Sequence, residues 1–94
     1  MNIMRYLVEF LGTFIFLSVI LIKGEPIAIG LTLTAMIYFG GSISGGAFNP
    51  AVAFALLIKN NLNTLQFIGY VIAELLGALC AFYFFKYTNS IKKF

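Results

Sequence analysis

The sequence of 94 residues has no histidine, a single cysteine and very little charge. Charged residues make up 10% of the chain, against about 25% in soluble domains. Without histidine the chain can form neither a histidine-based catalytic unit nor a Cys/His zinc site, and the lone Cys80 cannot form an internal disulfide. These absences argue against an enzyme, and we expect no catalytic residue, no cofactor and no metal.

The basic residues are scattered rather than clustered. Six of them against three glutamates give a net charge of +3. They are Arg5, Lys23, Lys59, Lys86, Lys92 and Lys93. No group of them resembles the basic stripe of a nucleic-acid-binding protein, whereas a modest positive excess suits anionic lipid headgroups. We therefore expect membrane lipid, and no nucleic acid, as a partner.

Apolar residues are what the chain has in excess. Hydrophobic residues make up 62% of it and the mean hydropathy is +1.03, while soluble domains average about 45–50% apolar residues. A chain this short buries too little of its surface to hide that excess in one core. The composition predicts an integral, multi-pass membrane protein of the all-α class.

Three apolar stretches predict membrane-crossing helices at residues 4–22, 27–41 and 64–85. The first and last would span about 28 and 33 Å, close to the thickness of the hydrocarbon layer. A cleaved signal peptide is disfavoured for the first stretch, because Glu9 lies inside it and no small-x-small site precedes Lys23. Residues 86–94 are expected to form a basic tail in water.

Between the second and third stretches, the sequence predicts a re-entrant loop at 42–49 followed by a half-helix at 50–58. Asn49 is a preferred N-cap residue and Pro50 a preferred first helical residue. Nine residues of helix span about 13 Å, or half of the bilayer. An ordinary capped loop at the membrane surface is the alternative, but no charge between Glu25 and Lys59 would anchor it there.

A helix that begins at mid-membrane points its positive dipole end and its free N–H groups into the membrane interior. Irregular backbone at that depth needs protein or water around it. The pore-loop backbone groups in need of such partners belong to Gly45, Gly46, Ala47 and Phe48. This arrangement is typical of a pore wall.

The chain resembles the major intrinsic protein family, the aquaporins and glycerol facilitators, whose signature triplet is carried here by Asn49, Pro50 and Ala51. Three further stretches resemble the family's first helix, its second helix with the following loop, and its third helix. They are Glu9-Phe10-Leu11-Gly12-Thr13-Phe14, Gly30-Leu31-Thr32 through Gly45-Gly46, and Tyr70-Val71-Ile72-Ala73 through Gly77. The resemblance implies that residues 1–94 form a single half-unit of an inverted-repeat channel fold.

Two glutamates inside apolar stretches, Glu9 and Glu74, are functional candidates because ionisable groups at membrane depth are energetically expensive. The resemblance implies that Glu9 braces the loop by accepting hydrogen bonds from its N–H groups. Glu74 lies where the family more often has glutamine, and we expect it to brace the loop as well, either protonated or ionised. A proton relay is the less favoured interpretation of the two.

Selectivity candidates also follow from the resemblance. Val52 follows the triplet where the family's second half usually has arginine, and Ile29 occupies a filter position that is often aromatic in water-selective members. Aliphatic residues at both places imply a wider, more apolar filter. We therefore expect a passive channel for water or small neutral solutes such as glycerol.

Small residues recur every fourth position along the last apolar stretch and predict a helix-packing ridge. They are Gly69, Ala73, Gly77 and Ala81. The tyrosines are mostly candidates for the interfacial aromatic belt, and we assign them no chemistry. They are Tyr6, Tyr38, Tyr70, Tyr83 and Tyr87.

The family fold requires two inverted half-units, and the economical expectation is an antiparallel homodimer, with higher oligomers of that dimer possible. The near balance of basic residues across the membrane permits insertion in both orientations. Pairing with a different half-length chain is one alternative. A non-conducting protein that modulates a full-length channel is the other.

Overall fold

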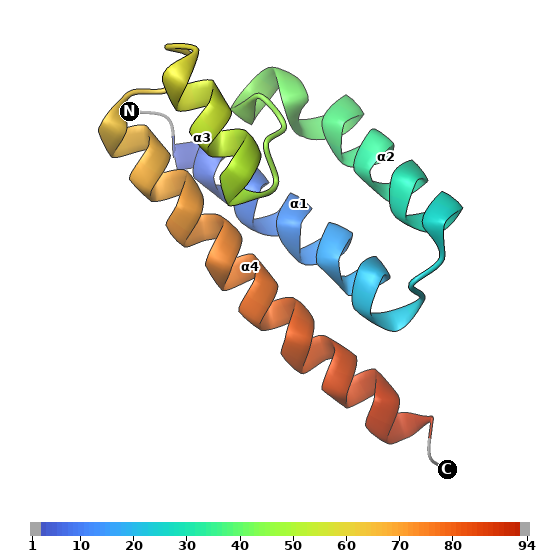
Figure 1. Ribbon diagram of the computed structural model, residues 1–94. Coiled ribbons are helices and arrows are strands. Elements are labelled where there is room, and N and C mark those ends of the chain that lie inside the picture. Colours follow the sequence, from blue (N-terminus) through green and yellow to red (C-terminus); the bar gives the residue numbers. More distant parts are fainter. Residues whose placement is uncertain (1–2, 93–94) are drawn as a thin grey trace.

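The computed structural model describes residues 3–92, which form four α-helices (Figure 1). The helices are α1 (Ile3–Ile22), α2 (Pro26–Ser44), α3 (Pro50–Ile58) and α4 (Thr64–Ile91). By length and composition α1, α2 and α4 can each cross a membrane, while α3, with 9 residues, is half as long as a crossing requires. The all-α fold with three crossings and one half-length helix, predicted from the sequence, is confirmed.

Local sequence explains where the helices begin. The Glu25 side chain caps α2 by accepting from the backbone N–H groups of Ile27 and Ala28, at 3.0 and 2.8 Å. These two bonds lower the pKa of the exposed Glu25 carboxyl below its ordinary value. At α4, Asn63 and Gln66 form a reciprocal capping box.

Two helix ends differ from the sequence-based expectation. The second helix continues to Ser44 rather than ending at residue 41, and it stops where Gly45 adopts a left-handed conformation with φ of 89°. A Cβ at Gly40 would lie 2.5 Å from the Val8 side chain, so glycine here serves close packing against α1 and does not break the helix. The predicted loop at 42–49 is accordingly shorter at its start.

The last helix continues to Ile91, although the sequence was expected to leave the helix after residue 85. No glycine or proline interrupts this stretch, and the Lys86 ammonium lies over the Phe82 and Tyr83 rings, 5.8 and 5.9 Å from their centroids. The predicted tail 86–94 is therefore helical through residue 91. Its last two residues, 93 and 94, lie outside the described residues.

The long helices pack around α1, which contacts both α2 and α4, while α3 lies against α4 (Figure 1). Helices α1 and α4 run parallel, since the Tyr6 and Tyr70 rings meet near their starts and the Phe14 and Phe84 rings further along, each pair with centroids 5.7 Å apart. The small-residue ridge of α4 faces α1. A Cβ at Gly77 would lie 2.7 Å from a backbone oxygen of α1, and Ala73 and Ala81 are buried.

Polar and small residues make up most of the buried interior, and most large apolar side chains lie outside. The buried polar residues are Glu9, Thr13, Ser18, Ser44 and Glu74. Leucine, isoleucine and phenylalanine side chains of all four helices are exposed. This distribution suits a chain whose surroundings are lipid.

Candidate functional site

The segment between α2 and α3 turns into the interior through three residues with left-handed backbone. Gly45, Gly46 and Phe48 have φ of 89°, 69° and 57°. Figure 1 shows this link folding back beside α1 before α3 begins. Because α3 then runs back toward the side where α2 ended, the segment enters and leaves the fold on the same side.

Phe48 marks how deep this segment reaches. Its ring is buried, with 1% exposure, and a Cβ at Gly12 would lie only 2.2 Å from its Cε1 atom. Gly12 is the tenth of the 20 residues of α1 that begin at Ile3. The ring therefore lies at the middle of a helix that is long enough to cross the membrane.

The Glu9 carboxylate holds the segment by three hydrogen bonds. The backbone N–H groups of Ala47 and Phe48 donate to Oε2 and Oε1 at 3.2 and 2.8 Å, and the Ser44 hydroxyl donates to Oε2 at 2.7 Å. Ser44 Oγ in turn accepts from the N–H of Gly46 at 3.2 Å. Glu9 is fully buried, so these donors replace the water that would otherwise solvate its carboxylate.

Tyr70 of α4 also holds the backbone at the start of this segment. The Tyr70 hydroxyl donates to the Ser44 carbonyl at 2.6 Å and accepts from Arg5 Nε at 3.0 Å, while the Arg5 guanidinium lies 5.5 Å from the Tyr70 ring centroid. Tyr70 is fully buried, so its placement in the interfacial aromatic belt was wrong. A signal existed in the sequence, because Tyr70 precedes Ala73, Glu74 and Gly77 on one helical face.

Glu74 does not brace the loop as predicted. Its side chain is buried, with 1% exposure, and over residues 3–92 neither carboxylate oxygen receives a hydrogen bond from a donor. Tyr70 packs on Tyr6 and Gly77 on Thr13, and this register places Glu74 opposite Glu9 of α1 instead. The loop N–H groups of Ala47 and Phe48 are bound by Glu9 alone of the two glutamates.

The signature triplet lies at the beginning of α3. Asn49 Oδ1 accepts from the N–H of Val52 at 2.9 Å and so caps the helix. Pro50, Ala51 and Val52 are exposed, Val52 by 40%. The N-terminal end of α3 therefore presents its first turn outside the chain.

The two selectivity candidates are not brought together within one chain. Ile29 is half-buried in the first turns of α2, while the loop and α3 follow the opposite end of α2. No contact joins α2 to α3 in the part of the chain that the structure describes. Both residues can line one conduit only if further protein closes it.

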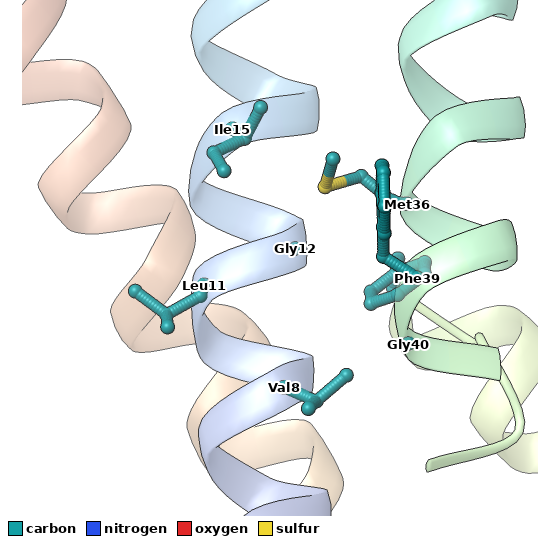
Figure 2. Close-up of a pocket in the computed structure, with 8 residues that line it drawn as sticks. Val8, Leu11, Gly12, Ile15, Met36, Phe39 and Gly40 are labelled. Atoms are coloured by element: carbon teal, nitrogen blue, oxygen red, sulfur yellow. The ribbon is translucent and has the colours of Figure 1, made fainter. Parts of the chain in front are cut away.

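Two cavities adjoin the loop. An apolar one of about 240 Å³ lies between α1 and α2 and reaches Gly12 and Phe48; Figure 2 shows Met36 of α2 pointing across it toward α1. A polar one of about 460 Å³ is lined by residues 41–45 with Arg5, Lys59 and Asn61. The segment thus borders both a polar and an apolar cavity.

The sequence of the chain is similar to those of known proteins of one family. The family model for the major intrinsic protein family matches residues 1–93. Glycerol uptake facilitator protein-like 6 of Lactiplantibacillus plantarum is 46% identical over 86 residues, covering 82% of this chain and 40% of that protein. Aquaporin Z of Brucella melitensis is 45% identical over 58 residues (62% of this chain, 25% of that protein), and nodulin-26 of Glycine max is 42% identical over 64 residues (68% and 24%).

The chain thus spans less than half of the length of these relatives. No solved structure matched it.

Proposed function

Because the chain belongs to the major intrinsic protein family, we propose that it builds half of the wall of a passive channel for water or small neutral solutes. It is an integral, multi-pass membrane protein. The observation that carries the proposal is the Glu9 carboxylate, which holds the loop backbone at half depth through Ala47 and Phe48. That anchor positions the Asn49-capped beginning of α3 inside the membrane.

The electrostatics of α3 favour uncharged cargo. The N-terminus of a helix carries about half a positive elementary charge, and its first N–H groups have no partners within the helix. Pro50 has no N–H, Asn49 Oδ1 accepts from Val52 and the Asn49 carbonyl accepts from Ala53. The N–H of Ala51 therefore remains as the first-turn donor for a passing hydroxyl group or water molecule. A positive dipole end at the centre of a pore repels cations.

A second half-unit in the opposite orientation completes the pore in this proposal, and a second copy of the chain supplies it. Support comes from the exposed first turn of α3 at Pro50, Ala51 and Val52. In an antiparallel pair these turns would meet at the midplane, as in other inverted-repeat transport folds. Each of Ile29 and Val52 would then occur twice along the conduit.

A homodimer of this kind requires that the chain inserts into the membrane in both orientations, so its basic residues must favour neither orientation strongly. Arg5 and Lys59 lie on one side of the crossings, while Lys23, Lys86 and Lys92 lie on the other. Lys59→Cys in a Cys80→Ser background should react with a membrane-impermeant thiol reagent from both sides of sealed vesicles. Labelling from one side only would eliminate the homodimer and favour a different partner chain.

The test of function is stopped-flow light scattering of liposomes that contain the purified chain alone, with water and glycerol compared. We expect osmotic water permeability above that of empty liposomes, together with glycerol flux, because Val52 and Ile29 leave an apolar filter. Absence of both fluxes from correctly folded chain would favour a heteromeric channel or a non-conducting modulator of a full-length channel.

Selectivity is tested by Val52→Arg and Ile29→Phe, which should lower glycerol permeability more than water permeability, by added donors and by bulk respectively. Ile58→Arg is the matched control for Val52→Arg, since it adds the same charge at the other end of α3, where Ile58 is 66% exposed. An unchanged glycerol-to-water ratio in both site variants would show that Val52 and Ile29 do not line the constriction.

A further inference from the structure

Two buried glutamates face each other between α1 and α4. The parallel register pairs Tyr6 with Tyr70 and Thr13 with Gly77, and Glu9 and Glu74 fall between these two contacts. The Glu9 and Glu74 side chains are 0% and 1% exposed, so both are enclosed between α1 and α4. Their carboxyl groups therefore share one enclosed space.

The two carboxyl groups differ in the donors available to them. Glu9 accepts three hydrogen bonds, from the Ser44 hydroxyl and from the N–H groups of Ala47 and Phe48. Glu74 receives none from residues 3–92. The neighbour that it does have is another acceptor, so a contact between them requires a proton that neither backbone nor hydroxyl supplies.

Among the described residues, no other charged group is placed to neutralise one of the two carboxyl groups. Helices α2 and α3 carry no charged side chain. On α1 the Arg5 guanidinium is bound to the Tyr70 hydroxyl and ring, and Tyr6 packs edge-on against that same ring. Two adjacent carboxylates in a water-poor interior repel strongly, and ionised groups at membrane depth are expensive in any case.

We propose that Glu74 is a carboxylic acid whose hydroxyl donates a hydrogen bond to the Glu9 carboxylate. The proton belongs to Glu74 because three donors already stabilise the ionised form of Glu9. Glu74 is then a positioning residue, which ties α4 to Glu9 and, through Glu9, to the loop. This inference goes beyond the proposed function, since it holds whether or not the pore conducts.

Infrared spectroscopy of the full chain in detergent or lipid tests the proposal directly. The chain has only three carboxyl side chains, Glu9, Glu25 and Glu74, and Glu25 is exposed. At neutral pH we expect the C=O stretching band of a protonated carboxylic acid in the native chain. The band should persist in Glu25→Gln, the matched control, and be lost in Glu74→Gln.

Two spectroscopic results would overturn the proposal. Absence of the acid band from the native chain at neutral pH would mean that both glutamates are ionised, with or without a bound cation between them. Persistence of the band in Glu74→Gln would mean that Glu9 holds the proton.

Thermal unfolding gives a second readout. Glu74→Gln retains a donor toward Glu9 through its amide N–H and should keep the native midpoint, whereas Glu74→Leu should lower it. A higher midpoint in Glu74→Gln would indicate relief of repulsion between two carboxylates and would contradict the proposal. The glutamine variant keeps the proposal testable even if the leucine variant does not fold.

Discussion

Replacing Gly12 by alanine should destabilise the chain even though alanine is the better helix former. A Cβ at this position would lie 2.2 Å from Cε1 and 2.6 Å from Cδ1 of the Phe48 ring, whereas carbon atoms pack best at about 3.5–4.0 Å. The ring is buried and the Phe48 N–H is bound to Glu9 at 2.8 Å. That bond fixes the Phe48 backbone, so the ring can give way only by turning about its own side-chain bonds.

The magnitude follows from two opposing effects. Overpacking a buried contact costs about 1–3 kcal/mol, and the approach here is more than one ångström too close, which favours the upper part of that range. Alanine recovers up to about 1 kcal/mol relative to glycine within a helix. We expect a net loss of about 1–2 kcal/mol in the free energy of unfolding.

Unfolding in mixed micelles of increasing denaturing-detergent fraction, followed by circular dichroism, measures this change. Gly30→Ala is the matched control, because no atom lies within 4 Å of a Cβ at Gly30, and it should be neutral or slightly stabilising. In a Phe48→Ala background the Gly12→Ala cost should disappear, which a double-mutant cycle detects.

If Gly12→Ala unfolds like Gly30→Ala, then the Phe48 ring does not rest on the middle of α1. The half-depth position of the loop would then be wrong.

Three further outcomes are expected. Glu9→Leu should lower the yield of folded chain on size-exclusion chromatography, because two loop N–H groups lose their acceptor at about 1–3 kcal/mol each. Glu9→Gln should lower the yield less. Equal yields of the native chain and the leucine variant would refute the bracing role. Asn49→Ala should lower the free energy of unfolding by about 1 kcal/mol through loss of the cap. It should also reduce liposome permeability more than Asn63→Ala, which removes the corresponding cap of α4. Equal reductions in permeability would count against a special role for α3. The backbone N–H groups of Ile27 and Ala28 lower the pKa of the Glu25 carboxyl. The ionised cap should therefore stabilise the fold above the ordinary glutamate pKa of about 4.3, and this stability is lost as the pH falls through the lowered pKa. The thermal midpoints of the native chain and Glu25→Gln should converge in acid, and parallel curves would show that the cap contributes nothing.

The helices and the half-helix were predictable because their signals are local. Apolar stretches of crossing length need only composition, and the beginning of α3 needs only Asn49 followed by Pro50. The resemblance added Glu9 as the acceptor for the loop. Each of these inferences depends on residues that are neighbours in sequence or on a recurring motif.

What the sequence did not reveal depends on contacts between distant residues. Tyr70 was misplaced because its bond to Ser44 joins α4 to the end of α2. The same holds for the end of α2, which was expected at residue 41: Gly40 lets Val8 of α1 approach closely, and the helix continues to Ser44. Glu74 was misassigned because the register of α4 against α1 turns it toward Glu9 rather than toward the loop.

Polar and small side chains lie inside this chain and large apolar ones lie outside. We therefore expect it to tolerate mutations at the positions where a soluble protein does not, and the reverse. Outward residues such as Leu31 and Ile72, 64% and 54% exposed, should accept almost any hydrophobic replacement, because lipid does not distinguish among them. A single methyl group at Gly77 would meet α1 backbone at 2.7 Å. In a library of random variants, the positions that resist change should therefore be glycine, serine and glutamate rather than leucine and isoleucine.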